Sequence, residues 1–182
     1  MTLQELLDTV PAYAKDLKLN LSTLLQQPEL TKPQIWGTAV ATATASRNAQ
    51  LAEGIVAEAS NHVSPEVIEA ARGAAAVMGM NNVYYRFLHM VKHEKYATMP
   101  ARLRMSIIRS HGVDPKDFEL WCEAVSAING CEACVESHDK EVREKGVSEE
   151  AILGAVRIAA VLHGLAAILD TAQVPAAVPV SA

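Results

Sequence analysis

The feature that most constrains the fold is a sequence motif that occurs twice. The segment I-W-G-T-A-V-A-T-A, which begins at Ile35, resembles L-W-C-E-A-V-S-A-I, which begins 85 residues later at Leu120. The segment V-S-P-E-V-I at Val63 likewise resembles V-S-E-E-A-I, 84 residues later at Val147. Chance similarity between Ala-rich helices is the alternative, but the paired tryptophans and the near-constant separation favour a repeat. We therefore expect two copies of one helical motif about a pseudo-twofold axis.

The composition favours helices for both copies. Half of the 182 residues are hydrophobic but only 4% are aromatic, so small and aliphatic side chains must fill the core. Such Ala-rich sequences suit closely packed helices, whereas strands favour β-branched and aromatic residues. We predict an all-α fold with one domain over 1–170, in which the copies span about 33–93 and 115–170. The segment 171–182 has two prolines and no charge, and is expected to be a loose tail.

Proline, capping residues and glycine mark the ends of the expected helices. Asn129 and Gly130 interrupt one apolar stripe, because both tolerate left-handed backbone angles. The sequence leaves open whether 79–82 breaks a helix or lies inside a longer one, and 99–112 is expected to be a connecting segment. The expected helices cover 11–27, 33–43, 47–60, 65–78, 83–93, 115–128, 131–145 and 148–169.

Charge and hydropathy exclude several classes of protein. A net charge of −5 argues against nucleic acid or an anionic membrane as a partner. The N-terminus lacks the basic region and apolar run of a signal peptide. The most apolar stretch, 154–169, contains Arg157 and His163 and is expected to be too short and too polar to cross a bilayer. We expect a soluble cytoplasmic protein, in which three cysteines indicate catalysis or metal binding more than a disulfide framework.

The chemistry concentrates in Gly130 to His138, G-C-E-A-C-V-E-S-H. On an α-helix these offsets would place Cys131, Cys134 and His138 on one face, one turn after another. Two thiols in contact with each other and with a base are the parts of a thiol–disulfide redox centre. The free N–H groups and partial positive charge of a helix start would lower a thiol pKa and populate the reactive thiolate.

Two other interpretations of the cysteines stay open. A zinc site would use Cys131, Cys134 and His138, but structural zinc needs four ligands and no second C-x-x-C is present, so we favour redox chemistry. Burial as an inert thiol suits the solitary Cys122 better than the spaced pair. A thioredoxin-type centre is disfavoured, because its C-x-x-C follows a strand and the preceding segment here is expected to be helical.

His138 and Glu119 are the other candidates for the site. His138 lies one turn after Cys134 and could keep that thiolate populated as a base; a surface histidine is the alternative. If the helices on either side of Gly130 form a hairpin, Glu119 would approach His138 and orient it. A solvated glutamate in a first helical turn is equally consistent with the sequence. Three further glutamates are expected to be solvated: Glu123, Glu132 and Glu136.

The first copy of the repeat lacks the candidate residues. Opposite Glu119, Cys131, Cys134 and His138 of the second copy stand Gln34, Ser46, Ala49 and Glu53, respectively. We therefore expect the first copy to be structural support and the second to carry the reaction.

Three motifs in the second copy resemble a known family. They are F-E-L-W (118–121), S-A-I-N-G-C-x-x-C (126–134) and V-E-S-H (135–138), and Y-A-K-D-L-K-L-N-L-S and A-A-A-V-M-G-M-N-N-V-Y-Y-R extend the likeness over nearly the whole chain. The chain is identified as a member of the AhpD family of alkyl hydroperoxidases, within the carboxymuconolactone decarboxylase-like superfamily. The resemblance implies an AhpD-like all-α fold with an internal two-fold repeat, and a homotrimer.

The resemblance also implies a mechanism. Cys134 would attack an alkyl hydroperoxide, Cys131 would supply a proton and then form the disulfide, and Glu119 and His138 would relay protons. A lipoylated acyltransferase and dihydrolipoamide dehydrogenase would re-reduce the disulfide through dihydrolipoamide, and the peroxiredoxin AhpC would accept electrons. No metal, haem or flavin is expected.

One departure from the family pattern bears on the rate. The best-known members have a histidine immediately before the second cysteine, where this chain has Ala133, so the proton-transfer role would fall on His138 and Glu119. Two alternatives to the peroxidase are a carboxymuconolactone decarboxylase-like enzyme, which does not need C-x-x-C, and a non-enzymatic thiol or zinc redox sensor.

Overall fold

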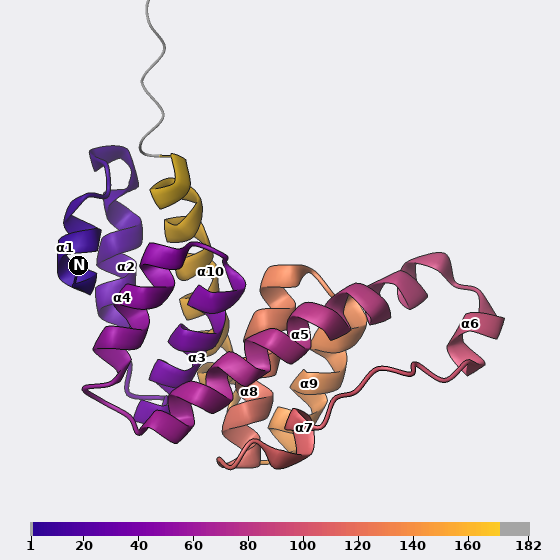
Figure 1. The fold of residues 1–182 in the computed structure, drawn as a ribbon. Helices are drawn as coiled ribbons and strands as arrows, with labels where there is room; N and C mark the ends of the chain where they lie inside the picture. The colour runs from indigo at the N-terminus through magenta and orange to yellow at the C-terminus, as the bar shows by residue number, and fades with distance from the viewer. Residues whose placement is uncertain (1, 172–182) are drawn as a thin grey trace, which may run out of the picture.

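The computed structural model describes residues 2–171, and these form helices and no strand (Figure 1), which confirms the all-α prediction. The predicted loose tail lies outside the described residues, apart from Thr171, which ends the last helix. The elements are α1 (Leu3–Asp8), a 3-10 helix η1 (Ala12–Ala14), α2 (Lys15–Leu24), α3 (Lys32–Ala45), α4 (Ala49–Ala59), α5 (Pro65–Val91), α6 (Glu94–Thr98), α7 (Ile107–Ser110), α8 (Pro115–Asn129), α9 (Glu132–Glu144) and α10 (Glu149–Thr171).

The predicted starts of two helices are confirmed, although Ser64 makes no side-chain capping bond. Helix α5 starts after Ser64 with proline in its first turn, and α8 starts after Asp114, whose side chain accepts a hydrogen bond from the Lys116 N–H. The open question at 79–82 is settled, because α5 continues through this segment without a break. Helix α1 was not predicted, and its capping box at Thr2 is the signal that would have identified it.

Helix α3 is the centre of the core. It packs against α5, α8 and α10, and ten of its residues are buried. Gly37 allows the closest of these approaches, since a Cβ there would lie 2.2 Å from the Trp121 ring on α8. Nearby, the Gln34 side chain donates a hydrogen bond to Asp117 across the same interface, over 2.9 Å. The predicted repeat copies therefore share one core.

The order of the helices is compatible with the predicted repeat. The first predicted copy contains α3, α4 and α5, and the second contains α8, α9 and α10. The short helices α6 and α7 lie between them. Both α3–α4 and α8–α9 are joined through a residue in the left-handed region, Arg47 (φ 65°) and Gly130 (φ 64°). The two-fold symmetry, the domain limits and the residue-by-residue alignment of the copies stay predictions.

Helix α10 is longer than the predicted apolar stretch. With 23 residues, the helix is long and apolar enough to cross a membrane, judged by length and composition alone. The expectation that the apolar stretch 154–169 is too short was therefore wrong. However, 56% of its most apolar 18-residue window is buried inside the protein, against α2, α3 and α8. A core helix meets the same criteria, so this is weak evidence for a membrane span.

The second half of α5 and the short α6 project from the body of the molecule, and the chain returns to α7 in an extended segment (Figure 1). We call residues 83–103 the arm. Its exposed large apolar side chains are Val83, Phe87, Met90, Val91, Tyr96, Met99 and Leu103. Clustered apolar exposure of this kind is typical of a surface that another protein chain covers.

Candidate active site

A tight hairpin between α8 and α9 carries the candidate site. Gly130 ends α8 in the left-handed region, where glycine avoids the steric cost that a Cβ would incur. The N–H of Gly130 bonds to the Ala127 carbonyl and that of Cys131 to the Ser126 carbonyl, each over 3.2 Å. The two helices on either side of Gly130 therefore form a hairpin, and α9 returns along α8.

Cys131 and Cys134 are joined by a disulfide bond, with their Cα atoms 5.3 Å apart. Cys131 is the N-cap of α9 and has extended backbone angles (φ −97°, ψ 90°), so it lies just outside the helix. We expected Cys131, Cys134 and His138 on one face of a helix. This expectation was wrong for Cys131. Both sulfurs still lie at the first turn of α9, where unpaired N–H groups favour a thiolate. Cys131 is completely buried, whereas Cys134 is 6% exposed.

The structure brings His138 and Glu119 together. His138 Nδ1 on α9 lies 2.7 Å from Glu119 Oε2 on α8, and both side chains are largely buried. Because an ionised carboxylate can only accept, the proton of this hydrogen bond belongs to Nδ1. The neutral imidazole then has Nε2 unprotonated, and this nitrogen can act as a base. The expectation of a solvated Glu119 is excluded by this geometry.

The third cysteine is a buried thiol. Cys122 lies on α8 with 1% of its surface exposed, and it has no disulfide partner. Burial, together with the nearby Glu119 charge, raises its pKa well above the usual range. A thiol that stays protonated is a poor nucleophile, which fits the interpretation of Cys122 as inert.

The prediction for Glu123 was wrong. Only 3% of this residue is exposed, and its Oε2 has no hydrogen-bond partner among the described residues. Burial raises its pKa to about 7, with a further contribution from the Asp139 charge that Arg143 partly offsets. Glu132 and Glu136 are exposed as predicted, and Glu132 pairs with His89 over 3.0 Å.

A buried polar network, which the sequence did not indicate, supports the hairpin from α5. Asn82 donates to the Ser126 hydroxyl and accepts from the Asn129 side chain, each over 2.9 Å. Arg86 donates to the Asn129 carbonyl over 2.5 Å. These bonds fix the end of α8 directly before Gly130, so α5 helps to position the cysteine pair.

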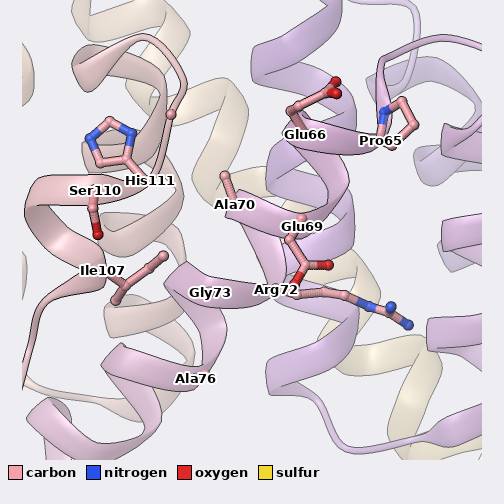
Figure 2. A pocket seen from close by; sticks show the side chains of 11 residues that line it. Pro65, Glu66, Glu69, Ala70, Arg72, Gly73, Ala76, Ile107, Ser110 and His111 are labelled. Atoms are coloured by element: carbon pink, nitrogen blue, oxygen red, sulfur yellow. The ribbon is translucent and has the colours of Figure 1, made fainter.

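A large groove lies away from this site. It has a volume of about 710 Å³ and runs between α5 and α7, with Ile107, Ser110 and His111 on one side and Gly73 opposite (Figure 2). It includes none of the four candidate residues. Within residues 2–171, no group of three or more His, Cys, Asp or Glu side chains is placed to hold a metal ion.

Comparisons with known proteins show the family of the chain. The model of the carboxymuconolactone decarboxylase family matches residues 94–177. A protein of Solibacter usitatus is 59% identical over 97% of this chain and 100% of its own length, and one of Acidobacterium capsulatum is 55% identical over 96% of both chains. A protein of Gluconacetobacter diazotrophicus is 56% identical over 94% of both. All three are named alkyl hydroperoxide reductase AhpD.

Proposed function

Because this chain belongs to the AhpD group of the carboxymuconolactone decarboxylase family, we propose that it is an alkyl hydroperoxide reductase that uses Cys131 and Cys134 as its redox centre. It is an enzyme of the oxidoreductase class. The observation that carries the proposal is the pairing of a dithiol at a helix start with a hydrogen-bonded His138–Glu119 pair one turn further along α9.

In the first step the Cys134 thiol passes its proton to His138 Nε2, directly or through one water. The thiolate attacks the terminal oxygen of the hydroperoxide, the S–O bond forms and the O–O bond breaks. The leaving alkoxide takes the proton of the Cys131 thiol and departs as the alcohol. Cys134 is thereby oxidised to a sulfenic acid, the reversible first stage of cysteine oxidation.

In the second step the Cys131 thiolate attacks the Cys134 sulfur. The S–S bond forms, the S–O bond breaks, and the leaving hydroxide takes the proton held by His138 to become water. The small exposure of Cys134 and the complete burial of Cys131 support this division of roles, because the attacking thiolate must meet the peroxide. Glu119 stabilises the imidazolium that exists between the two steps.

After each turnover, an external dithiol must supply two electrons to reduce the Cys131–Cys134 disulfide. We propose dihydrolipoamide on a lipoylated acyltransferase as the donor, with dihydrolipoamide dehydrogenase renewing it, and the peroxiredoxin AhpC as an electron acceptor. One donor thiolate attacks the Cys131–Cys134 disulfide and forms a mixed disulfide, which the second donor thiol resolves. The two enzyme thiols are regenerated and the lipoamide disulfide is formed. No bound cofactor enters this cycle.

Consumption of tert-butyl hydroperoxide with dihydrolipoamide as donor tests the function directly. We expect turnover that depends on both components, and a Cys131–Cys134 disulfide in mass spectra of peroxide-treated protein. A carboxymuconolactone decarboxylase-like enzyme would show no such turnover. A zinc sensor would retain a free thiol pair and contain zinc in metal analysis of the untagged protein.

We further propose that the protein is a cytoplasmic homotrimer. The apolar arm supports an oligomer, because Phe87 is 52% exposed and Met90 is 72% exposed beside Tyr96 and Met99. Side chains of this size at such exposure are typical of protein interfaces. A second copy of this chain is the partner that would always be available to cover them.

A further inference from the structure

A polar pocket lies behind the hairpin, on the side of α5. Its volume is about 280 Å³, and its lining includes Arg47, Asn82, Arg86, Asn129 and His163, from the α3–α4 turn, α5, α8 and α10. A smaller hollow of about 180 Å³ shares Arg47 and Asn129 with it and adds Arg72. Arg72 also lines the groove between α5 and α7, but its guanidinium points away from α7 (Figure 2).

The charged side chains that line this pocket and the hollow are all arginines, and therefore positive. Neither Asp nor Glu is among the residues that line the pocket or the hollow, although the chain has a net charge of −5. Arg47, Arg72 and Arg86 form no salt bridge within the described part of the chain. Concave sites that gather positive charge without acidic neighbours attract anions.

Arg47 is also held in an unfavourable backbone conformation. Its φ of 65° lies in the left-handed region, which costs free energy for a residue with a Cβ. The α8–α9 turn has a glycine in this conformation, Gly130, with φ 64°. Lys92 and Arg102 adopt the same conformation away from the pocket, so the backbone at Arg47 does not identify the ligand, but it does allow a glycine substitution there without strain.

We propose that this pocket binds a small oxyanion, a carboxylate or a phosphate. The planar guanidinium groups of Arg47 and Arg86 present paired donors that match both groups. The Asn82 and Asn129 amides are engaged with each other and with Ser126, so they hold the wall of the pocket. Arg86 donates to the carbonyl of Asn129, two residues before Cys131, so the bound anion would lie behind the dithiol turn.

Isothermal calorimetry with inorganic phosphate and, separately, with succinate tests the proposal, at constant ionic strength set with chloride. Turnover plays no part in this measurement, so its result is independent of the proposed peroxidase activity. We expect saturable binding of at least one ligand. Binding of phosphate alone identifies a phosphate source, whereas binding of succinate identifies an organic acid. No saturable heat with either ligand would overturn the proposal.

The variant Arg47→Gly removes the charge and suits the left-handed turn, so it should fold at least as stably as the wild type. We expect the affinity of this variant for the anion that the wild type binds to fall at least tenfold. The matched control is Arg102→Gly, since Arg102 is an exposed arginine with φ 52° that does not line the pocket. If both variants lose anion affinity equally, the positive charges attract anions non-specifically. That result would also overturn the proposal.

Discussion

Glu119 on α8 and His138 on α9 meet across the hairpin that Gly130 closes, with 2.7 Å between the carboxylate oxygen and Nδ1. The hydrogen bond fixes which nitrogen of the imidazole can act as a base. It also holds the ring on the face of α9 that continues from Cys134. The proton-transfer role proposed for His138 therefore depends on a residue 19 positions away in the sequence.

The first prediction concerns this pair. His138→Gln should lower kcat/KM for tert-butyl hydroperoxide by roughly 100-fold near neutral pH, the usual contribution of a general base. Glu119→Gln should have a smaller effect, because the Gln carbonyl can still accept from Nδ1 but no longer stabilises an imidazolium. Steady-state peroxide consumption measures both. The control is Glu136→Gln, an exposed residue on the same helix; an unchanged rate in His138→Gln would rule out the relay.

The second prediction separates the cysteines. Cys134→Ser should abolish turnover, since no thiolate remains to attack the peroxide. Cys131→Ser should instead trap Cys134 as a sulfenic acid, which a dimedone adduct reveals in mass spectra. Cys122→Ala is the control, because the raised pKa of this buried thiol keeps it unreactive, and it should retain full activity. Dimedone labelling of Cys131 in Cys134→Ser would reverse the proposed roles.

The third prediction concerns the buried Glu123. Its folded-state pKa of about 7 lies above the ordinary value of 4.5, so the folded protein binds its proton more tightly than the unfolded chain does. Stability from this group is therefore present below about pH 4.5 and is lost as the pH rises to 7, by on the order of 2 kcal/mol after allowance for screening. Glu123→Gln should remove this loss.

Urea unfolding of Glu123→Gln and the wild type at pH 5 and pH 8 measures this effect. We expect the variant to gain stability relative to the wild type between the two pH values. Glu136→Gln should show no such difference, because that side chain is exposed. Parallel pH dependence in the wild type and Glu123→Gln would contradict the assigned pKa.

The burial of Glu123 could not be predicted from the sequence. Most of the long helices could be predicted because prolines, caps and Gly130 act locally, whereas the contact between Glu119 and His138 was one of two equally consistent alternatives that depended on a hairpin at Gly130. The burial of Glu123 depends on how α9 packs over α8, which residue spacing does not determine. The same holds for the contacts of Asn82 and Arg86, which reach the hairpin from more than forty residues away.

The fourth prediction concerns the arm. Met90→Glu should disrupt the oligomer, because each interface would then bury an unpaired carboxylate. Size-exclusion chromatography with light scattering gives the mass directly. The matched control is Leu153→Glu, which places the same charge on an exposed leucine of α10 outside the arm. If the wild type is a monomer, or if Leu153→Glu dissociates it as readily, the arm is not the interface.

The fifth prediction tests the contact between α3 and α8, one from each predicted repeat copy. Gly37→Ala would place a Cβ 2.2 Å from the Trp121 ring, so α3 and α8 must separate. We expect a loss of about 3 kcal/mol in the free energy of unfolding, at the upper end of typical overpacking costs. Gly79→Ala is the control, since a Cβ there meets no atom within 4 Å and Ala favours the interior of a helix such as α5. This control should gain about 0.5–1 kcal/mol, and equal stabilities of the two variants in urea unfolding would contradict the close approach of α3 to α8.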